Sequence, residues 1–436
     1  MKKVAVIGGG FTGLVAARKL VAAGYQVTVF ESGAELGGLA ACFSVAGIPL
    51  EKAYHHLFHT DTDILALASE LGLDEVLEWR PSAVAIYRAG RIWPFASPVD
   101  LLRFGACSLG GRIRTGLAVL YLKKTRNWRK LADTTALDWM RRACGASATA
   151  AIWGPLLHGK FADHADRVSM AWLWARLHIR ANSRDPGDGG EKLGYFRGGF
   201  VQVAEALQRQ LAAGGARVEL ATPVRAIGHD GRGPTVDVGN GAQPYEAVLF
   251  TGSNAAFDRL LPQDPALDAY RNQLRGIKYL GAICHVFTSS QSLNDHYWIN
   301  INEDQAPFLV FIQHTNLLPT SYYNGKHVYY IGAYLPQDSA RFLMPDAQLV
   351  AEWQDYLKRI FPAFDPSLVE ESHMFRFKDA QHIVDIGYEA GILPCHTPLP
   401  GVFLANFAQI FPEDRGTNFA VREGQTIGQI MATFLG

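Results

Sequence analysis

Three histidines lie close together in the segment Tyr54-His55-His56-Leu57-Phe58-His59-Thr60. Imidazoles transfer protons near neutral pH, hydrogen-bond to cofactors and bind metal ions. The spacing disfavours a metal trio, because adjacent histidines in an extended chain point to opposite faces and no helper carboxylate is close by. We therefore expect His56 to take part in the chemistry and His55 to contact a bound cofactor, with a metal site or a structural role as the alternatives.

Two further segments carry polar residues that could face a ligand. The C-terminal loop contains Asp414 and Arg415, which we expect to contact a cofactor or substrate, with a surface salt bridge as the alternative. His158 and Lys160 flank a glycine and could also face a ligand. The nearby Trp172 and Trp174 could build an aromatic substrate chamber or belong to an ordinary core.

A glycine-rich turn near the N-terminus could place a cofactor beside these side chains. The β-branched run Lys3 to Ile7 is followed at once by Gly8-Gly9-Gly10-Phe11-Thr12-Gly13 and then by a helical pattern to Ala23. Gly8 permits a tight turn, Gly10 lets a pyrophosphate approach the backbone, and Gly13 lets the helix pack against the strand. The free N–H groups at the helix start, at Phe11 and Thr12, would face the phosphates.

The second strand, Gln26 to Phe30, ends at Glu31, 18 residues after Gly13. A carboxylate there can accept the ribose hydroxyls and disfavours a 2′-phosphate. The Gly37-Gly38 pair that follows can offer a second bare backbone to the cofactor. The pattern predicts a dinucleotide-binding site, and the alternative is a tight turn with a solvated Glu31. We expect Ser32 and Leu39 to be among the residues that contact the dinucleotide.

The stretch Val4 to Leu39 resembles the FAD-binding start of the amine oxidase, protoporphyrinogen oxidase and phytoene desaturase superfamily. The resemblance implies FAD, held non-covalently, and a backbone contact from Val224 to the adenine. Thr251 ends a buried strand beside the dinucleotide. At the C-terminus, a strand, turn and helix resemble the closing flavin motif of the superfamily, with Gly416, Thr417 and Asn418 at the helix start. Leu39 departs from the pattern, since many relatives carry a basic residue there.

Two further resemblances concern the chemistry. His56 to Thr60 resembles the HxFHT stretch of UDP-galactopyranose mutases, whose first histidine lies close to the flavin. The strand Gly281 to Val286 corresponds to the region where amine oxidases carry a lysine beside the flavin N5. Cys284 or His285 occupies that neighbourhood here, which argues against a primary or secondary amine as substrate.

The predicted fold class is α/β, with a Rossmann-like FAD-binding domain of the GR2 type interleaved with an α+β substrate domain that contains an antiparallel sheet and a helical region. The FAD-binding domain comprises residues 1–82, 196–260 and 396–436, the substrate and helical domain residues 83–195, and the substrate-domain sheet residues 261–395. The predicted elements are a helix at 61–73, a hairpin at 83–87 and 91–95, mostly helices over 98–181, a polar loop at 182–190, strands at 217–220, 222–227, 247–250, 282–288, 308–313 and 327–334, a helix at 346–360, a strand at 402–405 and a helix at 419–434.

Composition narrows the functional class. With 436 residues, the chain is long enough for two intertwined domains. It is 48% hydrophobic and 19% charged, and it balances 41 basic against 41 acidic residues, which excludes a disordered chain and disfavours nucleic-acid binding. The five cysteines are far apart and odd in number, so we expect no disulfide framework, no zinc site and a reducing, cytoplasmic location.

Residues 98–130 carry eight basic side chains against Asp100 alone, interleaved with leucines. Such a stretch can lie on an anionic membrane surface, and in protoporphyrinogen oxidases a helical region at this position in the chain meets the membrane. The alternative is a solvated helix that covers the core. We expect a cytoplasmic protein that could be peripheral at the inner face of the membrane.

The favoured function is an FAD-dependent oxidoreductase that removes a hydride from a bulky, partly apolar, lipid-like small molecule to the flavin N5. The first alternative is a non-redox enzyme like the UDP-galactopyranose mutases, acting on a sugar nucleotide or glycosyl lipid. The second is a non-catalytic FAD-binding protein. Substrate identity, electron acceptor and oligomeric state do not follow from the residues.

Overall fold

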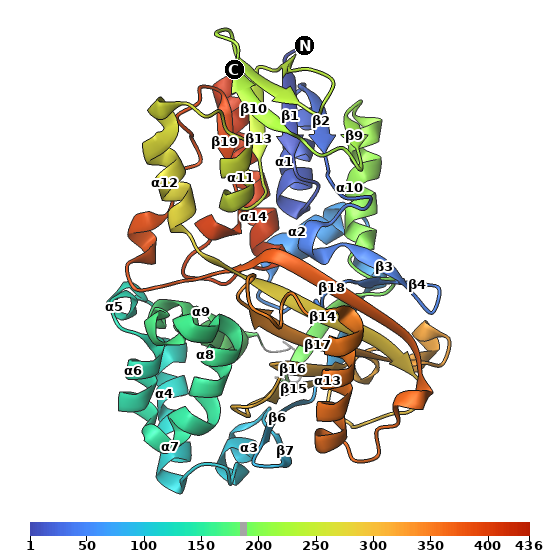
Figure 1. The fold of residues 1–436 in the computed structure, drawn as a ribbon, viewed down its shortest axis with the longest axis vertical. Coiled ribbons are helices and arrows are strands. Elements are labelled where there is room, and N and C mark those ends of the chain that lie inside the picture. Colours follow the sequence, from blue (N-terminus) through green and yellow to red (C-terminus); the bar gives the residue numbers. More distant parts are fainter. Residues whose placement is uncertain (184–189) are drawn as a thin grey trace.

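A five-stranded parallel sheet forms one end of the molecule (Figure 1), in a computed structural model that describes residues 1–183 and 190–436. Its order is β19-β13-β1-β2-β9, and every neighbouring pair is parallel. The strands are β1 Lys3–Ile7, β2 Gln26–Phe30, β9 Arg217–Glu219, β13 Ala247–Phe250 and β19 Val402–Leu404. Three distant parts of the chain therefore build one sheet, as expected for the α/β class.

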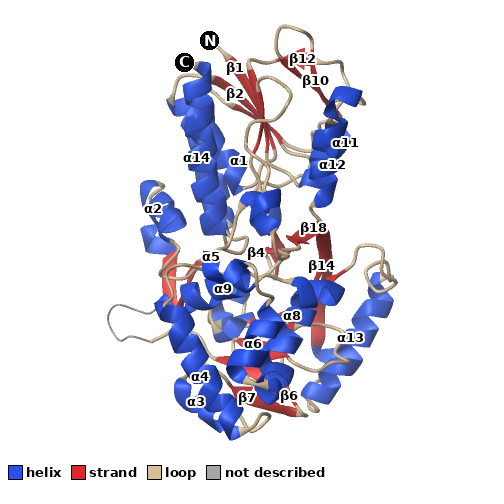
Figure 2. Ribbon diagram, turned by 90° about the vertical axis from the view of Figure 1, so that its left-hand side faces the viewer, coloured by secondary structure: helices blue, strands red, loops and turns tan. Residues whose placement is uncertain are grey.

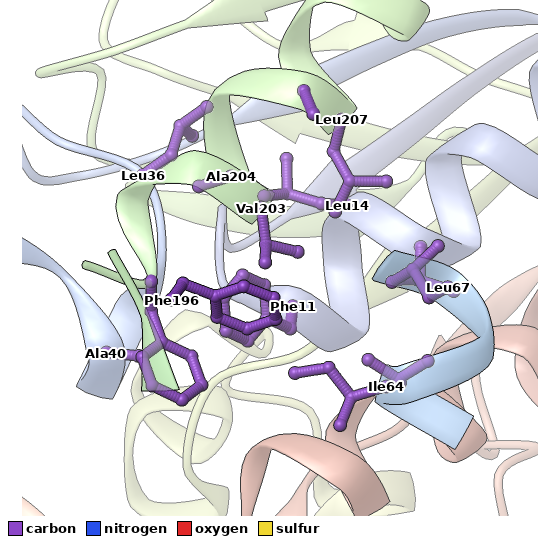
Figure 3. Close-up of a cluster of buried hydrophobic side chains, with 14 of the residues drawn as sticks. Phe11, Leu14, Leu36, Ala40, Ile64, Leu67, Phe196, Val203, Ala204 and Leu207 are labelled. Atoms are coloured by element: carbon purple, nitrogen blue, oxygen red, sulfur yellow. The ribbon is translucent and has the colours of Figure 1, made fainter. Parts of the chain in front are cut away.

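Helix α1 (Phe11–Ala22) packs between this sheet and two other helices, α10 (Val201–Ala213) and α14 (Thr417–Leu435). Figure 3 shows Phe11 and Leu14 among side chains from α10 and from α2 (Thr62–Glu70). Each fully buried side chain of this size contributes roughly 1.5–3 kcal/mol. This core fixes the position of the first turn of α1, which directly follows the glycine turn.

A second, seven-stranded sheet has the strand order β18-β14-β17-β16-β15-β6-β7. Its pairs are antiparallel except for β15 with β6. Helix α13 (Asp346–Ile360) packs its buried face on the hydrophobic cluster of this sheet. The strands are β6 Val84–Arg88, β7 Arg91–Pro94, β14 Tyr279–Ser289, β15 Trp298–Ile301, β16 Val310–Gln313, β17 His327–Leu335 and β18 Val369–His382.

A helical region follows β7 and lies at the end of the molecule away from the parallel sheet (Figure 2). Its buried side chains form a separate core around Met140, Phe161 and Trp172. The helices are α3 Pro98–Arg103, α4 Leu109–Lys124, α5 Arg129–Ala132, α6 Ala136–Cys144, α7 Ala146–Ala148, a π-helical turn Thr149–Trp153, α8 Gly154–Phe161 and α9 Met170–Asn182.

Smaller elements join these parts. They are the strand pairs β3 Cys42–Val45 with β4 Ile48–Glu51 and β5 Leu77–Pro81 with β8 Lys192–Phe196, the small sheet of β10 Ala226–His229, β11 Pro234–Asp237 and β12 Gln243–Pro244, and helices α11 Asn254–Leu260 and α12 Asp268–Gly276.

Most predicted elements are confirmed, including the hairpin of β6 and β7, the helices over 98–181 and helix α13. The strand predicted at 222–227 is wrong in its first part: it begins only at Ala226, because Ala221 has a positive φ of 47° and the Thr222 amide turns to bond the Glu31 carbonyl. Most of the loop predicted at 182–190 lies outside the described residues.

Candidate functional site

The glycine turn between β1 and α1 leaves an open cradle. Gly8 adopts a φ of +113°, which favours glycine, and a Cβ on Gly13 would lie 2.0 Å from the Gly8 oxygen. A Cβ on Gly10, by contrast, would meet only the Gly38 Cα, 3.8 Å away. No side chain caps the start of α1, so its amides are free for a ligand. Two bare backbones beside a free helix start fit a pyrophosphate.

Glu31 lies where the second strand ends, and its carboxylate has a fixed position. Oε2 accepts a hydrogen bond from the Gly9 amide and Oε1 one from the Gly33 amide, each at 2.7 Å. The Ser32 hydroxyl is 3.2 Å from Oε1. The Thr222 amide donates to the Glu31 carbonyl, which brings the segment containing Val224 to the same edge. This arrangement fits the ribose of a dinucleotide.

Some of the other residues expected at the cofactor are already bonded or buried within the protein, whereas others leave backbone groups free. The Thr251 hydroxyl donates to the carbonyl of Ile7 at 3.0 Å, so it braces the glycine turn. The Phe11 side chain is in the core, which leaves only its backbone for a ligand. The Asn418 side chain accepts from the Asp63 amide at 2.8 Å and so caps helix α2. Gly416 and Thr417 start α14 without a side-chain cap, so their end of the helix offers free amides.

A pocket lies at the junction of the cradle and the seven-stranded sheet. Leu39 lies directly after the Gly37-Gly38 pair, and the sheet contributes residues of β14, β17 and β18. The lining residues are Leu39, Ala53, Tyr54, His55, Ala282, Ile283, Cys284, Gly332, Ala333, Tyr334, Phe377, Ala380 and Arg415. The glycine cradle could hold the phosphates of FAD, and the pocket lies next to it.

His55, and not His56, lines this pocket. Its Nδ1 lies 2.7 Å from the Ala53 carbonyl, which can only accept, so Nδ1 carries the proton and Nε2 keeps its lone pair. Burial lowers the pKa of His55 to about 4. The ring is therefore neutral at pH 7, and its Nε2 can accept a hydrogen bond.

His56 packs beside the pocket against Tyr297 and Trp298, with Nδ1 3.2 Å from the Tyr297 hydroxyl. Burial, together with the nearby cation of Arg180, lowers the pKa of His56 to about 3. His59 instead stacks on Trp79 at 3.6 Å. The three rings thus have different neighbours, and no three His, Cys, Asp or Glu side chains in residues 1–183 and 190–436 are placed to hold a metal ion.

The alternation of β14 decides between its two candidate residues. Cys284 faces the pocket, and burial raises the pKa of its thiol to about 12. His285 points to the other face, where Nε2 lies 2.9 Å from the Ser372 hydroxyl under helix α13. A neutral thiol therefore occupies the position beside the pocket.

Asp414 forms the centre of a buried ion cluster. Its Oδ2 accepts from Lys160 Nζ at 2.7 Å and from Arg176 Nη1 at 2.6 Å. These cations hold the pKa of Asp414 well below its usual range despite burial. The alternative of a surface salt bridge is therefore wrong for Asp414, because the residue is 7% exposed. The predicted ligand role of His158 is not supported, because its ring is exposed and hydrogen-bonds to the carbonyl of Gly154 in its own helix.

Arg415 links this cluster to the pocket wall. It donates to the Tyr334 hydroxyl at 2.7 Å and to the Gln381 side chain at 3.2 Å. The Arg415 and Lys160 cations lower the pKa of Tyr334 against the effect of burial. Burial raises the pKa of the neighbouring Tyr54. Tyr334, Gln381 and Arg176 were not among the residues predicted from the sequence. The spacing of Trp172, Arg176 and Arg180 on one helix face is a signal that could have identified Arg176.

Comparison with known proteins agrees with this geometry. The family model described as flavin containing amine oxidoreductase matches residues 11–406. A Mycobacterium tuberculosis protein assigned as a flavin-containing monoamine oxidase, AofH, is 33% identical over 286 residues, which cover 62% of this chain and 61% of that protein. The chain thus spans about three fifths of the length of this curated relative.

Two solved structures share the fold over nearly the whole chain. A protein of Exiguobacterium sp. 255-15 assigned as a protoporphyrinogen oxidase has a TM-score of 0.78 at 18% identity and covers 99% of both chains. A reduced UDP-galactopyranose mutase has a TM-score of 0.75 at 15% identity and covers 99% of this chain and 96% of the other. At these identities the two structures support the architecture only.

Proposed function

Because the chain belongs to the flavin-containing amine oxidoreductase family and has FAD as its cofactor, we propose that it is an FAD-dependent oxidoreductase acting on a bulky, partly apolar substrate. When bound, FAD supplies a hydride acceptor at its N5 atom. The observation that carries the proposal is the pocket at the junction of the glycine cradle and the seven-stranded sheet. Its walls bring apolar carbon and a few polar groups to one place.

Side chains of the pocket supply hydrogen bonds that can position a substrate. The Nε2 lone pair of His55 can accept a hydrogen bond from a substrate at neutral pH, because burial keeps the ring neutral. Tyr334, held by Arg415, can fix the orientation of a polar substrate group. The neutral thiol of Cys284 lies where the resemblance to amine oxidases would place a lysine, which supports a substrate other than a primary or secondary amine.

Anaerobic mixing tests the oxidoreductase proposal. The holoenzyme is mixed with porphyrinogen, isoprenoid and glycosyl-lipid compounds without oxygen, and the flavin absorption is followed. We expect bleaching by one class and none by simple amines. Turnover of a sugar nucleotide only after dithionite reduction, with no net electron transfer, would replace the proposal with mutase-like chemistry, and a flavin that never reacts would indicate a non-catalytic protein.

We also propose that α3 and α4 rest on the anionic inner face of a membrane. Helix α4 turns five large apolar residues outward and buries Gly111, Thr115, Ala118 and Leu122. Among described residues, seven of the thirteen exposed large hydrophobic side chains lie on or beside these two helices: Val99, Leu102, Leu109, Ile113, Leu117, Leu120 and Tyr121. The basic residues of 98–130 are interleaved with them in the sequence, which suits an anionic lipid surface. No helix in the described residues is long and apolar enough to cross a membrane.

Vesicle sedimentation tests this surface. We expect the protein to bind vesicles containing phosphatidylglycerol more than vesicles of phosphatidylcholine alone. The double variant Leu117→Glu/Leu120→Glu should bind at least about tenfold less, since each loses an apolar contact and adds a repelled charge. Leu343→Glu is the matched control, because Leu343 is 68% exposed outside this surface. Equal binding by the double variant and this control would refute the membrane assignment.

A further inference from the structure

Beside the pocket, basic side chains outnumber acidic ones. Asp414 pairs with two cations, and Arg180 Nη2 lies 2.6 Å from Glu191. Arg415 adds another cation on the pocket wall. Among the described residues, the cluster contains four basic and two acidic groups, an excess of two positive charges; its members are Lys160, Arg176, Arg180, Arg415, Glu191 and Asp414. An anion bound at the exposed guanidinium ends of this cluster would offset the excess.

The open side of the cluster lies on one face of α9. Arg176 and Arg180 are one helical turn apart, and each guanidinium side chain is 41% exposed, whereas Lys160 and Asp414 are buried. Both arginines lie close enough to His56, which packs beside the pocket, to lower its pKa, so this face of α9 lies near the pocket. Arg176 donates one hydrogen bond to the described residues, from Nη1 to Asp414, and its remaining N–H groups have no partner among those residues.

Trp172 supplies a second, independent observation. It lies one turn before Arg176 on α9, and the Arg176 guanidinium carbon is 5.4 Å from its ring centroid. The indole is fully buried, yet its Nε1 has no hydrogen-bond partner among the described residues. A buried donor without an acceptor costs free energy, which an acceptor bound within reach of Nε1 would recover.

We propose that the substrate carries a phosphate group, bound by Arg176 and Arg180 beside Trp172. The proposal rests on the proposed function only in placing the substrate at the same pocket. A phosphate monoester carries about −1.5 to −2 charges, which matches the excess better than the single charge of a carboxylate. Guanidinium groups bind phosphate oxygens in pairs. The phosphate could belong to a water-soluble ester or to a lipid headgroup at the membrane surface.

Calorimetric titration of the FAD-loaded protein tests the site without any turnover. Inorganic phosphate replaces chloride at constant ionic strength, and the flavin absorption spectrum serves as a second readout. We expect saturable binding that Arg176→Gln and Arg180→Gln each weaken at least about tenfold. Arg209→Gln is the matched control, since Arg209 is 67% exposed on α10 and should leave the affinity unchanged. Flavin occupancy confirms that each variant is folded.

Three results would overturn the proposal: no saturable phosphate binding, wild-type affinity in both arginine variants, or acetate binding as tightly as phosphate. A comparison of glycerol 3-phosphate with dihexanoyl phosphatidic acid, below its micellar concentration, separates the two sources. Tighter binding of glycerol 3-phosphate supports a soluble ester. Tighter binding of dihexanoyl phosphatidic acid supports a lipid headgroup. Failure of every substrate panel to bleach the flavin would refute the oxidoreductase proposal but leave these binding results intact.

Discussion

Replacing Asp414 with asparagine should strongly destabilise the protein. The carboxylate is buried and accepts hydrogen bonds from Lys160 and Arg176. Asparagine keeps the shape but not the charge, so Lys160, itself 6% exposed, would remain buried near two arginines without a counterion. Breaking a buried pair in this way costs about 3–5 kcal/mol.

This free energy corresponds to a measurable shift in melting temperature. Unfolding entropy is about 2.1 cal/mol/K per residue, so for 436 residues a loss of 3–5 kcal/mol lowers Tm by about 3–5 °C if the chain unfolds as one unit. Far-ultraviolet circular dichroism of the FAD-saturated protein gives the Tm. Asp355→Asn is the matched control, because Asp355 is 77% exposed and its pair with Lys358 contributes little.

A double variant separates charge from packing. Lys160→Met in the Asp414→Asn background removes the uncompensated ammonium and keeps the chain length, so it should recover more than half of the lost Tm. If Asp414→Asn melts within 1 °C of the wild type (about 1 kcal/mol), or if the double variant melts as low as Asp414→Asn, the buried cluster does not have the energetic role assigned to it.

Two further changes follow from the same geometry. Glu31→Ala should weaken FAD binding at least about tenfold, because it removes the ribose acceptor and the acceptor for the Gly9 amide. The control Glu35→Ala, which breaks an exposed ion pair with Lys52, should leave FAD binding unchanged. Equal FAD affinities of the two variants would contradict the ribose assignment. Burial raises the pKa of Asp61 to about 6 from 3.8, so the folded state holds this proton more tightly and stability should fall by roughly 3 kcal/mol as pH rises from about 4 to about 6. Asp61→Asn should flatten the dependence of Tm on pH in that window, and an unchanged slope would show that Asp61 is ionised in the folded protein.

The sequence predicted the cofactor end of the molecule well because its signals are local. A strand, a turn that requires glycine, a helix and a terminal carboxylate all fall between Lys3 and Glu31, and each constrains the next. Strand β18 was missed although it has 14 residues. It is an edge strand that pairs only with β14 and carries polar side chains on both faces, so it lacks the hydrophobic alternation that indicates a strand.

The pocket could be predicted only in part, because it assembles residues that are far apart in the chain. Asp414 and Arg415 were identified as polar residues in a loop, but their partner Arg176 comes from a helix more than 200 positions earlier. The choice between Cys284 and His285, and between His55 and His56, depends on which face of an extended segment points inward. A shift of one residue reverses that face, and composition does not determine it.

Gly10→Ala tests the central claim, that the glycine cradle binds FAD, most directly. Gly10 has a φ of −74°, which alanine adopts, and its Cβ would clear the protein and enter the space assigned to the pyrophosphate. Gly110→Ala is the matched control, since its Cβ meets nothing within 4 Å. Titration of the apoproteins with FAD, followed by flavin fluorescence, should show at least about 100-fold weaker binding for Gly10→Ala than for the wild type and Gly110→Ala, with no loss of Tm in the apoprotein. Wild-type FAD affinity in Gly10→Ala would contradict the account.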